Sequence, residues 1–303
     1  MYNGGVVHRV TRRRFLKWML GSTATAGFSV LGGVGYAAFI EPRWPVVERV
    51  DVPLPGLPTD LDGFTIVQLS DLHRGPVMTQ ENITQAVELA LRQEADLIVL
   101  TGDYVSSSAD YAPSCAEALS PLVASGDVLA CIGNHDHWTN ADAVAGVLAD
   151  AGITVLCNAA QDVADGLWVA AVDDVWERYA DLEKALEGVP AGSAVVLLAH
   201  EPDYADEVAA DGRVSLQLSG HSHGGQVRLP FIGPPLLPYL GRKYPAGLYR
   251  VGGMWLYVNR GVGLISPPVR FNCRPEVTLL TLVRRHGTME SGRRRWTDRG
   301  DTL

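Results

Sequence analysis

Residues 219–226 read "SGHSHGGQ" and place two histidines, His221 and His223, one residue apart among glycines. The segment directly before them, "RVSLQL", has the apolar alternation of a β-strand. Imidazoles are common metal ligands, and glycine lets the backbone bend sharply where a strand ends. Pairs of this kind also occur on ordinary surface loops, so the motif alone leaves a metal site and a plain loop equally open.

Polar residues follow four other predicted strands in the same way. The apolar segments in "GFTIVQLSDLH", "ADLIVLTGDY", "GDVLACIGNHDHW" and "SAVVLLAHEPD" each end in acidic, amide or imidazole side chains. Ligands bind at the carboxyl ends of strands in open α/β sheets, where the chain leaves the core. We therefore expect a shared site built from these strand ends. Its candidate residues are Asp71, His73, Asp103, Asn134, His135, His200, His221 and His223.

Each strand-end cluster is a weak signal by itself, because an Asp after a strand is more often a helix cap or a turn residue. Five such clusters together favour a metal site. Carboxylates, imidazoles and one amide, without cysteine, suit a divalent ion such as Mn, Fe or Zn. The candidates outnumber the ligands of one open centre and suit two ions about 3.5 to 4 Å apart, an arrangement used for in-line displacement at phosphorus.

Five motifs in this order, "SDLH", "TGDY", "GNHDH", "LAHEPD" and "GHSHGGQ", resemble the calcineurin-like metallophosphoesterase superfamily over about residues 64–226. The extended form "GHSHGGQVRLP" is similar to a membrane-linked bacterial branch, the YkuE- and YaeI-like phosphodiesterases. The resemblance implies an α/β (α+β) fold, a four-layer sandwich of two mixed β-sheets flanked by helices. It also implies an enzyme that hydrolyses phosphoric ester bonds.

The resemblance further implies a role for each candidate residue. Asp103 would bridge two metal ions, and a hydroxide between the ions would attack phosphorus. His135 would stabilise the phosphoryl charge or protonate the leaving oxygen. The two histidines of the opening motif would then serve different ions. One ion would be held by Asp71, His73 and His223, and the other by Asn134, His200 and His221.

Other polar residues near the motifs have less specific interpretations. Arg260 and Arg270 are candidates for contact with a substrate phosphate, with surface salt bridges as the alternative. Gln226 is interpreted as a support for a ligand histidine. Asp136 and His137 adjoin the site in sequence, and their interpretation as solvated turn residues is at least equally favoured.

The first seventeen residues carry five basic groups and no acid, and Arg12-Arg13 matches the twin-arginine export pattern. An uncharged stretch from Trp18 to Ile40 follows, which is long enough to span a bilayer because roughly 20 residues suffice. An ordinary membrane anchor with basic flanks is the alternative. The sequence thus predicts an exported protein, carried by the twin-arginine machinery and either anchored by this segment or cleaved after it.

Three regions are predicted along the chain: a leader or anchor over 1–44, a catalytic domain over 45–284 and a disordered basic tail over 285–303. The domain contains a Pro- and Gly-rich insertion, 229–247. The insertion either packs over the sheet edge or reaches lipid headgroups. Its apolar candidates for lipid contact are Phe231, Ile232, Leu236, Leu237, Tyr239 and Leu240.

Strands alternating with helices in the first half of the domain indicate α/β layers, and a later hairpin indicates a mixed sheet. The clearest patterns predict strands over 47–52 and 64–69, helices over 79–92, 140–150 and 180–187, a hairpin over 247–261 and a last strand in "EVTLLTLV".

The formal net charge is −9, with basic ends and an acidic body. An acidic body argues against nucleic acid as a partner, since phosphate backbones require a basic surface. The four cysteines form no C-x-x-C pair, which excludes a zinc ribbon or a thioredoxin motif.

We therefore predict a phosphodiesterase that depends on two divalent ions and acts on a phosphodiester or a lipid-linked phosphate. Two alternatives stay open. One is a pyrophosphatase acting on a nucleotide-linked lipid of the UDP-diacylglucosamine type. The other is a non-catalytic, metal-stabilised binding module of the cell envelope.

Overall fold

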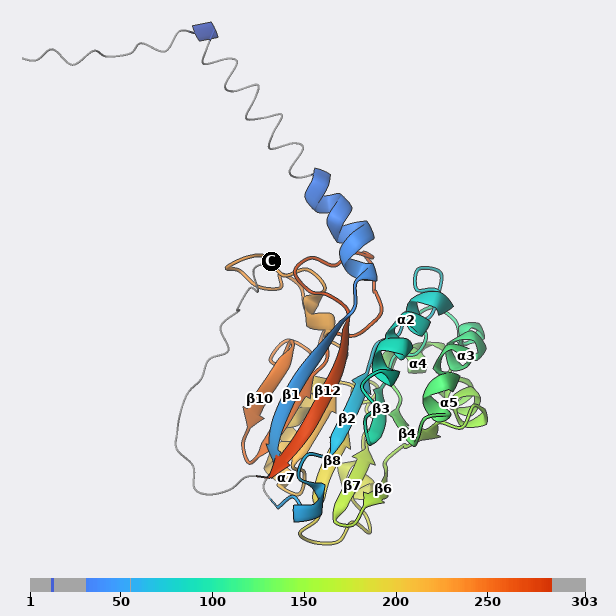
Figure 1. Ribbon diagram of the computed structural model, residues 1–303, viewed down its shortest axis with the longest axis vertical. Coiled ribbons are helices and arrows are strands. Elements are labelled where there is room, and N and C mark those ends of the chain that lie inside the picture. Colours follow the sequence, from blue (N-terminus) through green and yellow to red (C-terminus); the bar gives the residue numbers. More distant parts are fainter. Residues whose placement is uncertain (1–11, 14–30, 55, 285–303) are drawn as a thin grey trace, which may run out of the picture.

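The computed structural model describes residues 12–13, 31–54 and 56–284, and its body consists of two β-sheets packed face to face (Figure 1). Helices cover the outer face of each sheet. This arrangement confirms the predicted sandwich of two mixed sheets flanked by helices. Most of the predicted leader and the basic tail lie outside the described residues, so what was predicted for them stays a prediction.

The first sheet has the order β1-β12-β2-β3-β4-β5. Four of its strands are parallel, so their carboxyl ends lie at one end of the sheet. β12 runs antiparallel to β2 and parallel to β1. The strands are β1 (Val46–Leu54), β2 (Thr65–Leu69), β3 (Leu97–Thr101), β4 (Val128–Cys131), β5 (Thr154–Val155) and β12 (Glu276–Arg284).

The second sheet has the order β10-β11-β9-β8-β7-β6. Its four central strands are parallel, and the two edge strands are antiparallel to their neighbours. β10 and β11 form the predicted hairpin. The strands are β6 (Ala159–Ala164), β7 (Leu167–Ala171), β8 (Ala194–Leu198), β9 (Leu216–Ser219), β10 (Gly247–Val251) and β11 (Met254–Val258).

Alternate residues of the central strands pack on opposite faces, which is why these strands read as unbroken apolar runs. In β2, Ile66 belongs to the core between the sheets, whereas Val67 packs in the core under the helices. α2 (Gln80–Leu91), α3 (Ala112–Val123) and α5 (Ala141–Asp150) cover the first sheet. α6 (Leu182–Ala185) and α7 (Ala205–Asp211) cover the second.

Local signals set several helix ends. α2 begins after Thr79, whose hydroxyl accepts a hydrogen bond from the Asn82 backbone N–H in a capping box, and α5 begins after the Asn140 cap. The short α4 (Asn134–Thr139) begins inside the "GNHDH" motif. Single helical turns occur at η3 (Thr59–Leu61), η4 (Ala109–Tyr111), η5 (Pro202–Tyr204) and η6 (His223–Gly225).

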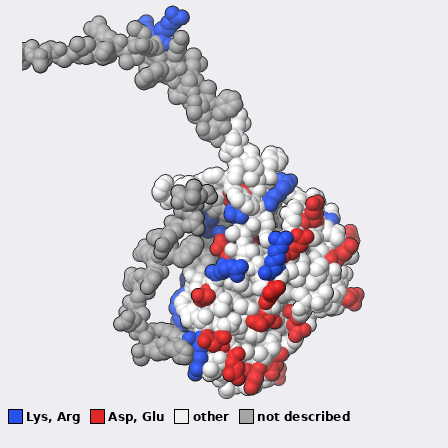
Figure 2. Space-filling model, viewed as in Figure 1, with Lys and Arg blue, Asp and Glu red and all other residues white. Residues whose placement is uncertain are grey.

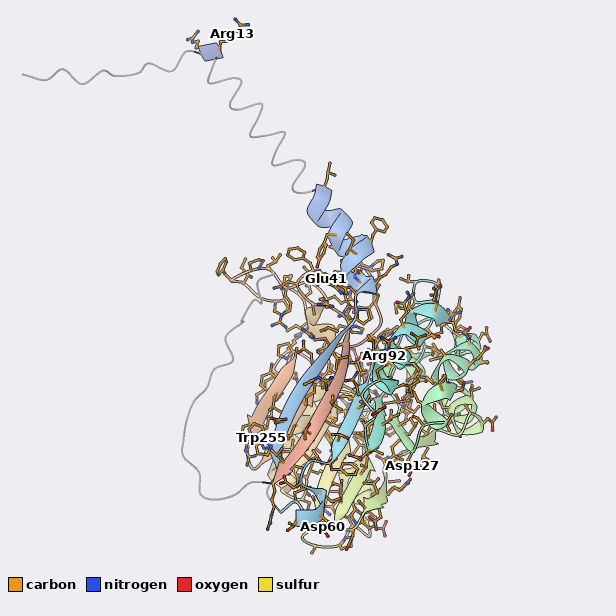
Figure 3. The ribbon with its side chains drawn as sticks, in the orientation of Figure 1. Arg13, Glu41, Asp60, Arg92, Asp127 and Trp255 are labelled. Atoms are coloured by element: carbon orange, nitrogen blue, oxygen red, sulfur yellow. The ribbon has the colours of Figure 1, made fainter. Side chains whose placement is uncertain are left out.

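The N-terminal segment projects from one end of the sandwich as a helix over 31–35, η1 (Tyr36–Ile40) and η2 (Glu41–Arg43) (Figure 1). It is bonded to the domain at its base, where Figure 3 labels Glu41. The buried Glu41 carboxylate accepts hydrogen bonds from the backbone N–H groups of Asn272 and Cys273. The Arg270 N–H donates to the Ala37 carbonyl at 2.9 Å. No helix among the described residues is long and apolar enough to cross a membrane.

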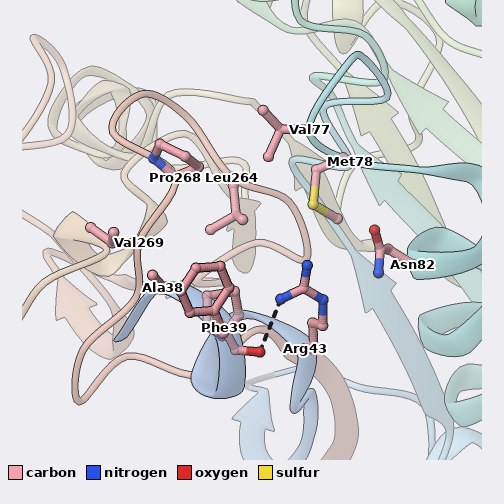
Figure 4. Close-up of a pocket in the computed structure, with 10 residues that line it drawn as sticks. Ala38, Phe39, Arg43, Val77, Met78, Asn82, Leu264, Pro268 and Val269 are labelled. Carbon is pink, nitrogen blue, oxygen red and sulfur yellow. Dashed lines mark hydrogen bonds between the residues drawn. The ribbon is translucent and has the colours of Figure 1, made fainter. Parts of the chain in front are cut away.

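A mostly apolar cavity of about 320 Å³ lies where this segment meets the domain (Figure 4). Phe39 and Arg43 line one side, with the Arg43 guanidinium donating to the Phe39 carbonyl at 2.9 Å. Met78, Leu264 and Val269 line the domain side. The N-terminal segment therefore packs beside the loops that precede α2 and β12.

Candidate metal centre

The carboxyl ends of strands from both sheets meet at one place. The Gln68 side chain, on β2, donates to the carbonyl of Ser219 on β9 at 3.0 Å. The backbone N–H of His221 donates to the Asp71 carboxylate at 3.0 Å. These bonds join the first sheet to the "GHSH" motif of the second, so the polar residues predicted from separate strands become neighbours.

Asp71, His73 and His223 form the first group of donor atoms, and all three are buried. The Nε2 atoms of the two histidines lie only 2.9 Å apart, and Asp71 Oδ1 lies 3.3 Å from His223 Nε2. The Nδ1 atoms of both rings are buried without a hydrogen-bond partner. Two imidazole nitrogens that converge with a carboxylate in this way fit a cation between them.

Asp103 lies between the first group and a second one. Its Oδ2 atom is 3.4 Å from His73 Nε2 and 3.1 Å from His200 Nε2. Its Oδ1 atom accepts the backbone N–H of His135 at 2.8 Å. One carboxylate oxygen thus faces histidines from both groups, which is the position expected of a bridging ligand.

Asn134, His200 and His221 form the second group. Asn134 Oδ1 and His221 Nδ1 are 2.9 Å apart. His200 Nδ1 donates to the Thr101 carbonyl at 2.7 Å, and His221 Nε2 donates to the Tyr239 carbonyl at 2.7 Å. A carbonyl can only accept, so these bonds put a proton on His200 Nδ1 and His221 Nε2 and leave His200 Nε2 and His221 Nδ1 facing the other donor atoms. Burial acts to lower the pKa of His200, but the adjacent Asp103 raises it well above its usual value, so a metal at His200 Nε2 would replace a proton there.

Burial sets the protonation of three of these histidines. It lowers the pKa of His73 to about 3, that of His221 to about 3 and that of His223 well below its usual value. All three imidazoles are therefore neutral at pH 7, which is the form that binds metal.

The carboxylates carry the negative charge of the centre. Burial raises the pKa of Asp71 to about 6; His200 opposes this shift and Asp103 adds to it. Burial also acts to raise the pKa of Asp103, but the adjacent His200 and His135 hold it well below its usual value. Neighbouring buried carboxylates and neutral imidazoles make a donor set that fits divalent cations.

Most of these residues have an unusual backbone conformation. A positive φ, between 50° and 68°, is found at Asp71, His73, Asp103, His221 and His223. Residues with a Cβ rarely adopt this left-handed region, and its strain concentrates at functional sites. The strand-end turns therefore aim these side chains at a cost in backbone strain.

Two glycines permit the close approach of these turns. A Cβ at Gly220 would lie 2.2 Å from an Asp71 carboxylate oxygen, and a Cβ at Gly133 would lie 2.4 Å from an Asp103 carboxylate oxygen. Neither position has room for a side chain. The glycines in "GHSH" and "GNHDH" thus bring the backbone next to the carboxylates of the first sheet.

The interpretation of Asp136 as a solvated turn residue is wrong. Its side chain is fully buried and accepts the backbone N–H groups of Gly133, Asp103, Tyr104 and Val105. Burial, followed by the charge of Asp103, raises its pKa to about 7. Asp136 therefore fixes the turn that carries Asp103. In the sequence, this role is signalled by the position of Asp136 as the third residue of α4, the helix that begins after Gly133.

His135 is partly buried and stands at the edge of the first group. Its ring contacts the His73 ring edge-on, with centroids 4.6 Å apart, and also packs against Trp138 at 4.6 Å. The next histidine, His137, points elsewhere: its Nε2 lies 2.7 Å from Asp173 and its ring stacks on Tyr179. The structure thus brings His135, but not His137, to the donor groups.

Arg260, Arg270 and Gln226 were predicted to contact the substrate phosphate or to support a ligand histidine, but their side chains bond other parts of the protein. Arg260 is paired with Glu48 and Glu276. The fully buried Arg270 donates to four backbone carbonyls, including those of Gly261 and Gly263. The bonds found for both arginines are thus with the protein itself, and their contact with substrate stays a prediction. The interpretation of Gln226 is corrected, because its side chain bonds Ile265 and Pro267 rather than a histidine.

The chain is similar to known metallophosphoesterases along most of its length. The family model described as "Calcineurin-like phosphoesterase" matches residues 64–225. The chain is 38% identical over 283 residues to an uncharacterized metallophosphoesterase, YkuE, of Bacillus subtilis, covering 90% of this chain and 98% of that one. It is 36% identical over 282 residues to the phosphodiesterase YaeI of Escherichia coli, covering 90% of this chain and all of the relative.

A more distant relative is the "Transmembrane protein with metallophosphoesterase domain" of Danio rerio, which is 31% identical over 284 residues. That match covers 88% of this chain and 63% of the fish protein. The ligand-like residues at the strand ends and the length of these matches lead to one conclusion. The chain belongs to the calcineurin-like phosphoesterase family and is a metallophosphoesterase, a hydrolase of phosphoric esters.

Proposed function

We propose that the protein is a phosphodiesterase that uses two divalent ions, Mn, Fe or Zn, and acts on the outer side of the cytoplasmic membrane. The position of Asp103 carries the proposal, since one oxygen of this carboxylate lies within 3.4 Å of both His73 and His200. A single ion would not require a carboxylate between two separate groups of ligands. The name of the relative YaeI supports a diester substrate over the pyrophosphatase and the binding module.

The residues of the centre have separate roles in the proposed hydrolysis. When bound, the ions supply positive charge that activates a water molecule and neutralises the phosphoryl oxygens. Asp71 and Asp103 balance this charge, and the carbonyls of Thr101 and Tyr239 orient two of the histidines through their second nitrogens. His135, at the edge of the centre, stabilises the phosphoryl group or protonates the leaving oxygen.

Metal analysis combined with turnover tests this proposal. We expect the purified protein to hold two equivalents of metal and to hydrolyse bis(p-nitrophenyl) phosphate. Removal of metal by a chelator should abolish turnover, and added Mn should restore it. A protein that holds one equivalent and is fully active, or one that binds two and hydrolyses no ester, would contradict the proposal.

We also propose that the twin-arginine machinery exports the protein. Arg12 and Arg13 are the residues that support this route, and the apolar stretch up to Ile40 leads into the segment bonded to the domain through Glu41. The name of the Danio rerio relative supports a membrane location for this family branch. Export of a folded chain would allow the enzyme to load its metals in the cytoplasm.

Replacing Arg12 and Arg13 together by lysine is expected to leave active enzyme in the cytoplasm. The pair is recognised by a receptor, so lysine keeps the charge but not the signal. Cell fractionation with a diesterase assay measures the outcome. The matched control is Arg43→Lys, just past the apolar stretch, which should leave the location unchanged. Normal export of the double variant would mean that another insertion route is used.

The exposed apolar side chains support work at a membrane surface. Leu237 and Leu240 of the insertion are half-buried, but its other apolar candidates are exposed. On the face shown in Figure 2, basic side chains lie near the base of the N-terminal segment, and acidic side chains crowd the far end of the body and line one flank. Large apolar residues are exposed both in the N-terminal segment up to residue 44 and in the insertion over 229–247. They are Leu31, Val34, Phe39, Ile40, Trp44, Leu229, Phe231, Ile232, Leu236 and Tyr239.

A further inference from the structure

Three aromatic side chains form a continuous cluster beside the metal centre. Trp176 lies at its middle and contacts the rings of Trp138 and Tyr239 edge-to-face, each with centroids 5.3 Å apart. The three residues come from α4, from the loop after β7 and from the insertion over 229–247. Segments far apart in sequence therefore build one aromatic surface, here named the aromatic wall (Trp138, Trp176 and Tyr239).

The aromatic wall touches the residues of the centre directly. The Trp138 ring packs against His135 at 4.6 Å, and the Trp176 ring meets His221 at 5.6 Å. The Tyr239 carbonyl accepts the proton of His221 Nε2. The wall thus contacts His135 at the edge of the first donor group and His221 in the second.

Packing of the core does not account for the aromatic wall. Trp138 is 51% exposed and Tyr239 is 56% exposed, and neither belongs to a core cluster. The ring of Trp138 is nevertheless held in place, because its Nε1 donates to the Glu177 carboxylate at 2.8 Å. An exposed yet fixed aromatic surface beside a reactive centre is typical of a ligand-binding subsite.

We propose that the aromatic wall binds an organic group of the substrate and selects phosphoesters in which that group carries a flat aromatic ring, such as an aryl or a nucleobase-bearing group. This inference rests on the proposed phosphodiesterase function and names its substrate class. The faces of the indole rings provide area on which a flat group of the substrate can stack. Because the three rings contact one another edge-to-face, they do not stack on each other. The wall holds the organic group while the phosphate meets the metal centre.

Two phosphonates that are not hydrolysed, phenylphosphonate and methylphosphonate, test the subsite with the metal-loaded full chain. They share the phosphorus group and differ in the organic group. We expect phenylphosphonate to bind about tenfold more tightly, both by calorimetry and as an inhibitor of bis(p-nitrophenyl) phosphate turnover. In Trp138→Ala this ratio should fall to about one through weaker binding of the phenyl compound alone.

Two further variants make the test specific. Trp138→Phe keeps a flat ring and should retain most of the preference. Trp44→Ala removes a tryptophan of similar exposure, 53%, whose ring contacts Arg274 instead, and should leave the binding of both phosphonates in solution unchanged. Equal weakening of both phosphonates in Trp138→Ala would assign Trp138 a structural role through His135 and overturn the inference. No phenyl preference in the unchanged protein would overturn it too, whereas failure to bind either phosphonate would contradict the proposed function itself.

Discussion

Replacing Asp103 by asparagine is expected to abolish hydrolysis and to reduce the bound metal from two equivalents to one or fewer. The Asp103 carboxylate faces His73 and His200 at once, and it is buried where no solvent can replace its charge. An amide is neutral and has one acceptor oxygen, so it cannot balance two cations. Asparagine keeps the shape of the side chain and can still accept the N–H of His135, so we expect the fold to survive.

Metal analysis and turnover of bis(p-nitrophenyl) phosphate measure both effects, and the melting temperature checks the fold. Asp127→Asn is the matched control, because Asp127 is exposed and lies away from the centre (Figure 3). That variant should keep both metals and the full rate. Near-normal activity of Asp103→Asn with two metals bound would remove the two-metal mechanism.

The second large effect is expected from His135→Ala, which should keep both metals and lose roughly 10² to 10⁴ in rate. His135 contacts the ring of His73, and a nitrogen of its ring lies within 4.8 Å of the donor atoms of His73 and Asp103, but Asp71, His73 and His223 already form a group of three donors without it. Its loss therefore removes help given to the phosphoryl group or the leaving oxygen, without emptying the centre. Rates and metal content measured on one preparation separate the two effects.

A series of leaving groups distinguishes the two roles of His135. If the imidazole protonates the leaving oxygen, the loss should shrink for phenols of low pKa; an equal loss across the series would indicate charge stabilisation. His137→Ala is the control, since His137 pairs with Asp173. Loss of metal together with rate in His135→Ala would show that His135 belongs to the ligand set instead.

The fold class could be predicted because its signals are local. Apolar runs such as that of β2 and caps such as Thr79 depend on neighbours in sequence, and the polar strand ends pointed to one edge of the sheets. α3 was not predicted. It contains Pro121, which removes a backbone hydrogen bond inside the helix, and burial of residues such as Leu119 and Leu122 outweighs that loss.

Parts of the site could not be predicted because they depend on tertiary contacts. Asp136 is indistinguishable from a turn residue in the sequence, since the N–H groups that it accepts from Asp103, Tyr104 and Val105 lie about 30 residues earlier. The aromatic wall likewise unites three residues whose spacing has no pattern. Arg270 appeared available to a phosphate because the carbonyls that surround it belong to loops with no regular structure.

The pairing of β1 with β12 has a consequence for folding during synthesis on the ribosome. Val46 lies opposite Glu276 and Leu54 opposite Arg284, so the first strand of the domain pairs with its last. β1 leaves the ribosome early, but it cannot pair until β12, the last strand of the domain, has been synthesised. The hydrogen bonds of Glu41 likewise cannot form before Asn272 and Cys273 have been synthesised. Packing of the segment over 31–43 against the domain thus requires a completely synthesised domain, and a chain truncated before Asn272 would lack the contacts that hold Glu41.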